Sequence, residues 1–175
     1  MAFEVSRRRI VVFGGASANS GLLQDTWALG PVYSAPILQA FGTGCGTQPL
    51  TLEAMTARGP VYASQFVTKV RNVPQGLAFM SLGVSNTTVG PLFLPFDLAG
   101  FGGTGGCMLY HDTAIELGSA CAPAGSGEAT HTFTVPNLPA ITGLPVYLQA
   151  WAPDSTFNLL GLVTSNALRT TVGNN

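Results

Sequence analysis

Short runs of apolar, β-branched and aromatic residues recur along the chain, and residues that favour turns separate them. No segment of useful length repeats its apolar residues with the period of an amphipathic helix. The runs instead have the length and spacing of strands joined by turns. They predict strands at 50–55, 65–73, 76–84, 92–98, 107–111, 114–117, 130–135, 144–151 and 168–172. We therefore expect an all-β fold, a jelly-roll-like antiparallel β-sandwich of about nine strands.

The clearest alternation of apolar and polar residues lies in the predicted strand at 130–135. His131, Phe133 and Val135 share one face of this strand, and threonines occupy the other face. Successive side chains of a strand point to opposite faces, so this pattern is typical of a strand with one buried face and one solvated face.

The N-terminal part of the chain predicts a separate β-hairpin. Residues 9–13 read R-I-V-V-F and end at a double glycine, and residues 22–29 read L-L-Q-D-T-W-A-L. Together they resemble the second half of a kelch repeat, in which the double glycine ends one strand of a propeller blade and the Asp and Trp belong to the following strand. The chain holds one such copy, whereas a propeller needs several blades. The resemblance implies either a propeller upstream in a longer parent or a hairpin reused in another setting.

These patterns divide the chain into three parts. We expect a partial kelch-like hairpin at 1–30, a linker at 31–41 and a β-sandwich domain at 42–175. Pro31 and Pro36 limit helix formation in the linker.

The predicted hairpin is too apolar to remain in water by itself. An isolated two-stranded hairpin is marginally stable, and burying a large apolar side chain is worth roughly 1.5–3 kcal/mol. We therefore expect Val12, Phe13 and Trp27 to be buried against something outside the hairpin. The first choice is the chain's own sandwich; the second is a neighbouring copy, because exposed strand edges invite pairing between chains.

A second resemblance covers residues 41–173. This region opens with F-G-T-G-C and continues with P-L-F-L-P-F-D-L-A-G-F-G, G-C-M-L-Y and V-P-N-L-P-A-I-T-G-L-P-V-Y-L-Q-A-W. In this order the segments are similar to a C-terminal domain of large exported proteins from planctomycetes and related bacteria, often found after propeller or other repeat regions. The resemblance implies an extracellular β-sandwich, and it offers no catalytic residues to carry over to this chain.

The three cysteines allow more than one pairing. The simplest arrangement is one disulfide and one remaining thiol, and three free thiols are the alternative. Cys45 and Cys107 match the recurrent cysteines of the family above, so the resemblance implies a disulfide between them. A bond between Cys107 and Cys121 is the chief rival.

The composition limits the partners and the location of the protein. Charged residues make up 9% of the chain, the formal net charge is −1, and one cluster of arginines at 7–9 is too small for a nucleic-acid-binding face. No apolar run is long enough to span a membrane. Low charge and the family resemblance favour a secreted, extracellular protein. Residues 1–9 lack the apolar stretch of a signal peptide, so we expect the signal to lie outside this chain.

Motifs that could carry chemistry have simpler interpretations as turns. Residues 100–105 match G-x-G-x-x-G, but a strand-like run follows them where a dinucleotide site needs a helix. His111 and Asp112 are adjacent, so they point to opposite faces, and we expect His111 at the surface or at a strand end. Residues 154–158 are a weak calcium-like sequence that we interpret as a self-capping turn. The sequence thus predicts no catalytic residues, no cofactor and no metal.

We therefore expect a non-catalytic structural or accessory β-sandwich module of an exported protein. One alternative is a carbohydrate- or surface-binding module, which a row of solvent-exposed aromatic rings on one sheet or rim would favour. The available rings, for which core packing is the default, are Trp151, Tyr147, Tyr110, Tyr62 and Phe157. The other alternative is a self-assembling filament or surface-layer subunit that donates its N-terminal hairpin to a neighbour, which would need an open sheet edge to receive it.

Overall fold

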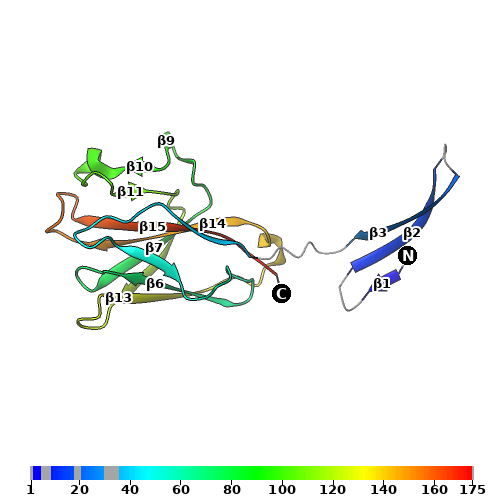
Figure 1. Cartoon of the computed structure of the whole chain (residues 1–175), viewed down its shortest axis with the longest axis horizontal. Helices are drawn as coiled ribbons and strands as arrows, with labels where there is room; N and C mark the ends of the chain where they lie inside the picture. The colour runs from blue at the N-terminus through cyan, green and yellow to red at the C-terminus, as the bar shows by residue number, and fades with distance from the viewer. Residues whose placement is uncertain (1, 5–8, 18–20, 30–35, 175) are drawn as a thin grey trace. The chain divides into compact units, whose positions relative to one another are not determined.

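A computed structural model describes residues 2–4, 9–17, 21–29 and 36–174. The chain forms two compact units, Met1–Tyr33 and Ser34–Asn175. Strands joined by turns and two short 3₁₀ helices build the described residues, which confirms the all-β prediction (Figure 1). Among these residues, no helix has the length and apolar character needed to cross a membrane.

The N-terminal unit is a three-stranded antiparallel sheet in the order β1-β2-β3. Its strands are β1 (Ala2–Glu4), β2 (Arg9–Ser17) and β3 (Gly21–Leu29). The predicted hairpin is therefore present as β2 and β3, and β1 extends it. A bulge interrupts the β2–β3 register between Phe13 and Gly15, where Gly14 takes a left-handed backbone conformation with φ of 66°.

The docking expected for this hairpin stays a prediction. Phe13 is 62% exposed and Val12 is half-buried. The side chain of Trp27 lies outside the described residues.

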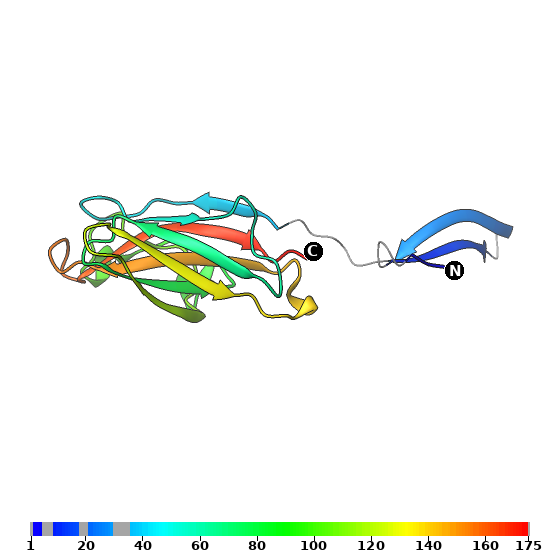
Figure 2. The same cartoon turned by 90° about the horizontal axis from the view of Figure 1, so that it is seen from below.

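The second unit is a sandwich of two antiparallel sheets (Figures 1 and 2). The five-stranded sheet has the order β12 (Ile115–Cys121), β7 (Leu77–Gly83), β14 (Pro145–Pro153), β15 (Leu162–Thr171) and β4 (Leu38–Phe41). The three-stranded sheet has the order β13 (Glu128–Thr134), β6 (Gln65–Arg71) and β5 (Thr51–Ala54). A short 3₁₀ helix, η3 (Pro139–Ile141), precedes β14.

The hydrophobic core lies between these two sheets. In the five-stranded sheet, Leu148 of β14 pairs with Leu82 of β7 and Leu168 of β15. In the facing sheet, Phe66 pairs with Phe133, and their rings meet edge to face at 5.5 Å. The predicted alternation of β13 is confirmed, because its inward positions are buried or half-buried while its threonines are exposed. Burial of these side chains is the main favourable term in the folding of the sandwich.

A third layer, which we call the cover segment, consists of residues 84–114. It contains β8 (Thr88–Val89), β9 (Leu92–Phe93), β10 (Phe96–Asp97), η2 (Leu98–Phe101) and β11 (Met108–Leu109). Gln149 of β14 points away from the core and is 2% exposed beneath this segment. Its Nε2 donates to the carbonyls of Met108 (2.8 Å) and Ser165 (2.9 Å), and its Oε1 accepts from the amide of Tyr110 (3.0 Å). Strand β14 is therefore buried on both faces.

Several predicted boundaries differ from the structure. Strand β15 begins at residue 162, where the expected strand began at 168, and β12 runs to residue 121, where the expected strand ended at 117. The last residues of the expected linker at 31–41 form β4, which pairs with Ala167–Thr170 of β15. This strand is only four residues long. Its first and last residues are half-buried and its two middle residues are exposed, so it lacks the alternation by which a strand is recognised from sequence. The expected strand at 92–98 is divided into β9 and β10, because Pro95 has no N–H to donate to a ladder.

Thr68 of β6 provides a test of the core. Its side chain is fully buried opposite His131, and its Oγ1 has no hydrogen-bond partner in the described part of the chain. An unpaired buried hydroxyl costs roughly 1–3 kcal/mol, so Thr68→Val should raise the free energy of unfolding by about 1 kcal/mol. Urea denaturation measures this change. Thr130→Val, on the exposed face of the neighbouring strand, is the control and should stay within about 0.5 kcal/mol of the parent. A loss of stability in the Thr68 variant would contradict this account of the core.

Candidate functional site

Four turns at one end of the sandwich surround a polar cleft with a volume of about 710 Å³. We call it the loop-end cleft. It lies at the end opposite to the C-terminus, where the β14–β15 connection and the turns near it gather (Figure 1). Its polar lining side chains include Gln48, Asn72, Gln75, Ser126, Asp154 and Thr156.

Hydrogen bonds between the turns fix the walls of this cleft. Asn72 sits in the turn after β6 with a left-handed φ of 61°, which asparagine tolerates better than most residues. Its Nδ2 donates to the carbonyl of Pro49 at 2.8 Å. The amide of Val73 donates to the carbonyl of Gly127 at 2.9 Å. Three of the four turns are thus held to one another, by the side-chain amide of Asn72 and by a hydrogen bond between backbone atoms.

The fourth turn is closed by Asp154. Its Oδ1 accepts hydrogen bonds from the amide (3.1 Å) and the hydroxyl (2.7 Å) of Thr156. This geometry is that of an Asx turn, as expected from the sequence of residues 154–158.

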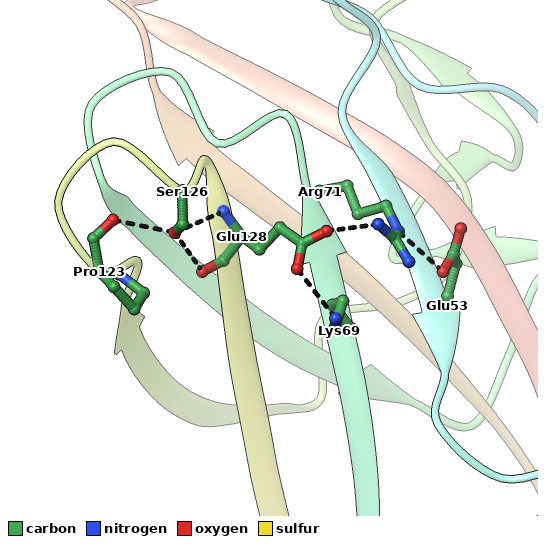
Figure 3. Close-up of polar contacts among 6 residues, drawn as sticks. All are labelled: Glu53, Lys69, Arg71, Pro123, Ser126 and Glu128. Carbon is green, nitrogen blue, oxygen red and sulfur yellow. Dashed lines mark hydrogen bonds and ion pairs between the residues drawn. The ribbon is translucent and has the colours of Figure 1, made fainter.

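An ion network borders the cleft on the outer face of the three-stranded sheet (Figure 3). Arg71 of β6 donates through Nε to Glu53 of β5 at 3.0 Å and through Nη1 to Glu128 of β13. Lys69 donates to the other oxygen of Glu128 at 2.9 Å. The hydrogen bond from Lys69 lowers the pKa of Glu128, and the hydrogen bond to Glu53 raises the pKa of Arg71. Both shifts favour the charged forms of Glu128 and Arg71, which are paired with each other.

This pairing leaves a cleft rich in hydrogen-bonding groups and poor in uncompensated charge. One cationic side chain, Arg71, and two anionic ones, Glu128 and Asp154, line it. Arg71 and Glu128 neutralise each other, and Asp154 is held by Thr156. What remains for a ligand is a set of amides and hydroxyls, each able to donate or accept a hydrogen bond. No local pattern in the sequence indicates this site, because its residues come from turns far apart in the chain.

His111 lies elsewhere, and its expected position at the surface is wrong. The side chain is fully buried where the cover segment returns to the five-stranded sheet. Its Nδ1 donates to the carbonyl of Asp112 at 2.6 Å, and its Nε2 lies 3.5 Å from the hydroxyl of Ser81. Gly83 leaves room for the ring, since a Cβ there would collide with it. Burial lowers the pKa of His111.

Asp112 has the expected turn role. Its Oδ1 accepts hydrogen bonds from the amides of Val84 (2.8 Å) and Ser85 (2.7 Å). The carboxylate thereby ties the end of the cover segment to its beginning.

The disulfide between Cys45 and Cys107 is confirmed. Both cysteines are buried, and the bond joins the loop after β4 to the cover segment. Cys121 is a free, exposed thiol at the end of β12.

The aromatic rings proposed for a carbohydrate platform are used mainly in packing. Tyr110 and Tyr147 are buried and meet Phe41 edge to face, at 5.7 and 6.2 Å between ring centres. Trp151 stacks on Phe79 at 4.6 Å. Tyr62 and Phe157 are partly buried against the core. These five rings therefore do not form a row facing solvent.

The G-x-G-x-x-G match at 100–105 lies in a turn. Gly102 ends η2 with a left-handed φ of 86°, and its carbonyl accepts a hydrogen bond from the amide of Leu160. The short strand β11 follows the turn, as expected from the sequence. No group of three His, Cys, Asp or Glu side chains within the described residues is arranged to hold a metal ion.

Scans of protein-family models, curated proteins and solved structures found no match to this chain. The kelch-like and planctomycete-type resemblances therefore stay predictions.

The buried histidines predict that acid destabilises the protein. Burial lowers the pKa of His111 and of His131. Between the lowered folded pKa values and the ordinary value of about 6.5, the unfolded chain binds more protons, so stability falls as pH drops through this window. Urea midpoints measured at about pH 7.5 and about pH 5.5 should show this loss.

A variant isolates the contribution of the histidines. Glu116, whose pKa is raised by burial, changes stability in the opposite direction as pH falls, so the parent protein reports a sum. The double variant His111→Gln, His131→Gln should lose less stability between the two pH values than the parent. An equal loss in both proteins would show that other groups cause the pH dependence.

Proposed function

We propose that this chain is a non-catalytic accessory module of an exported protein and acts outside the cell. The observation that carries this proposal is the buried disulfide between Cys45 and Cys107. Disulfides form and persist in oxidising compartments and are rare in the cytosol. The low content of charged residues, 9%, is compatible with this location.

The side chains that could act in catalysis make contacts within the fold instead. This supports the proposal that the module is non-catalytic. His111 is buried beneath the cover segment, and Asp112 caps a turn. Glu128 is engaged by both Lys69 and Arg71. A general acid or base must reach a substrate proton, and these groups are committed to contacts within the fold.

The two resemblances complete the proposal. The sandwich would be a C-terminal domain of a large exported bacterial protein, as in planctomycetes, and the hairpin at 1–30 would be the remnant or continuation of a kelch-like propeller. A polysaccharide or another cell-surface component is the partner that such a location offers.

Removal of the disulfide tests this proposal. The bond spans 62 residues of sequence. In the chain-entropy model, a loop of this size contributes about 4 kcal/mol, so the Cys45→Ala, Cys107→Ala variant should lose about that much free energy of unfolding. The control Cys121→Ser changes an exposed free thiol and should have little effect. Peptide mapping without reduction, on protein secreted into an oxidising compartment, should find the bond; free thiols with unchanged stability would oppose the proposal.

A self-assembling subunit is a second candidate, favoured by an open sheet edge. Strand β12 forms one edge of the five-stranded sheet, and most of its residues are exposed. On the other side of the sandwich, the side-chain amide of Asn166 bonds both the N–H (2.8 Å) and the carbonyl (3.1 Å) of Leu52 on β5, so this part of the β5 edge is already occupied. An exposed edge such as β12 can receive a strand from another chain. The donated element would be the N-terminal hairpin.

Oligomeric state tests this second candidate. If the hairpin of one copy adds to β12 of another, the full chain should assemble in solution, as measured by light scattering after size-exclusion chromatography. Ile115→Lys, which places a charge on the exposed edge, and deletion of residues 1–30 should each give a folded monomer. Thr132→Lys, on an exposed face of the other sheet, is the control. A monomeric parent chain would exclude assembly by this route.

A further inference from the structure

We infer that the loop-end cleft binds a neutral saccharide. The inference rests on the proposed function, because a glycan is a ligand that a module outside the cell meets. It assigns that function to a defined surface, the four turns at one end of the sandwich.

The size and form of the cleft suit a small ligand. Its volume of about 710 Å³ falls in the range of about 300–1,000 Å³ typical of ligand sites. Two glycines of its lining, Gly125 and Gly127, adopt left-handed φ values of 76° and 61°, and a Cβ at either would meet no other atom. The ligand can therefore approach the backbone of this turn directly.

The polar groups of the cleft match the chemistry of a sugar. Three exposed amide side chains reach it, Gln48 from the loop after β4 and Asn72 and Gln75 from the turn between β6 and β7. Gln48 makes no side-chain hydrogen bond to the described residues, and Gln75 makes a single long one, 3.4 Å to the hydroxyl of Ser155. A primary amide donates and accepts at once, and a sugar hydroxyl does the same, so neighbouring hydroxyls can bond to one amide in both directions.

The electrostatics of the cleft argue for a neutral ligand. Arg71 is engaged by Glu53 and Glu128, so it is not available as a free cation for phosphate or carboxylate. The two carboxylates of the lining, Glu128 and Asp154, already accept hydrogen bonds from the chain. An anionic ligand would meet a lining with more negative than positive groups. No free positive charge would offset the free-energy cost of removing water from the anion.

Apolar lining atoms provide the remaining surface that a sugar needs. Pro74 is exposed in the turn between Asn72 and Gln75, and Val73 and Val163 lie buried beside it. The ring C–H groups of a pyranose can rest on such a surface while its hydroxyls bond to the amides. The hydrogen bonds that join the turns hold the backbone of the cleft in place before binding, which lowers the entropic cost of association.

A titration of the full chain with neutral oligosaccharides tests the inference. The probes are gluco-, manno- and xylo-oligosaccharides, with an oligogalacturonate as the anionic comparison. Nuclear magnetic resonance spectra report on each side-chain amide, and calorimetry gives the affinity. We expect at least one neutral probe to shift the amide signals of Gln48, Asn72 and Gln75 at concentrations up to about 10 mM, and the anionic probe to bind more weakly.

Two variants separate the cleft from other surfaces. The double variant Gln48→Ala, Gln75→Ala should weaken binding at least about tenfold, because two hydrogen-bonding partners are removed. Gln39→Ala removes an exposed glutamine on β4, away from the cleft, and should leave the affinity unchanged. Equal binding by the parent and the double variant would place any saccharide elsewhere, for example on the exposed rings of Phe93 and Phe101, and would overturn the inference.

The saccharide site and the extracellular location can fail independently of each other in these experiments. If no neutral probe shifts the cleft amides while the disulfide is found in the secreted protein, the saccharide site is wrong and the extracellular module stands. If the cysteines are free while the cleft binds a saccharide, the location is wrong and the site stands. Stronger binding of the anionic probe would contradict the neutral character assigned to the cleft.

Discussion

The buried amide of Gln149 is the interaction on which the outer half of the structure depends. It satisfies a backbone carbonyl and a backbone amide of the cover segment together with a carbonyl of β15. A buried polar group without partners costs more than a typical hydrogen bond contributes, so Gln149 and the cover segment require each other. Because the segment lies on this face, the centre of the five-stranded sheet is withdrawn from solvent. The surfaces that the sandwich leaves for partners include the turns at the loop end, the edge strand β12 and the outer face of the smaller sheet.

The disulfide and the buried amide stabilise the same segment in different ways. The bond between Cys45 and Cys107 restricts the unfolded chain, and its effect is independent of how well the cover segment packs. The hydrogen bonds of Gln149 act only in the folded state, where they fix the position of Met108 and Tyr110. Tyr110 in turn packs on Phe41 and donates its hydroxyl to the carbonyl of Thr43, so the segment also holds the loop that contains Cys45. The loop continues to Gly46 and Gln48, which line the cleft.

Local patterns predicted the fold well where one face of a strand is solvated. The alternation of His131 and Phe133 with threonines identified β13 and the face it buries. Strand β14 shows no such alternation in burial, because Gln149 and Tyr147 are covered as fully as Leu148, so its outer face could not be recognised from sequence. His111 was misplaced for the same reason, since its burial is caused by a layer that no local pattern indicates. The disulfide was expected from a resemblance to other proteins, and the residues themselves left its pairing open.

The cleft could not be predicted from local patterns in the sequence. Its amides lie in ordinary turns, and each turn has the signals that any turn has, such as Asn72 in a left-handed conformation. Only the topology brings these turns to one end of the sandwich. The ion network follows from the register instead: Lys69 and Arg71 alternate along β6, and the neighbouring strands place Glu53 and Glu128 beside them. Exposed ion pairs of this kind contribute little to stability, so the network matters more for what it does to the adjacent surface. Because the network pairs Arg71 with two carboxylates, the rim of the cleft offers hydrogen-bonding groups and little uncompensated charge. Such a rim favours a neutral ligand over a charged one.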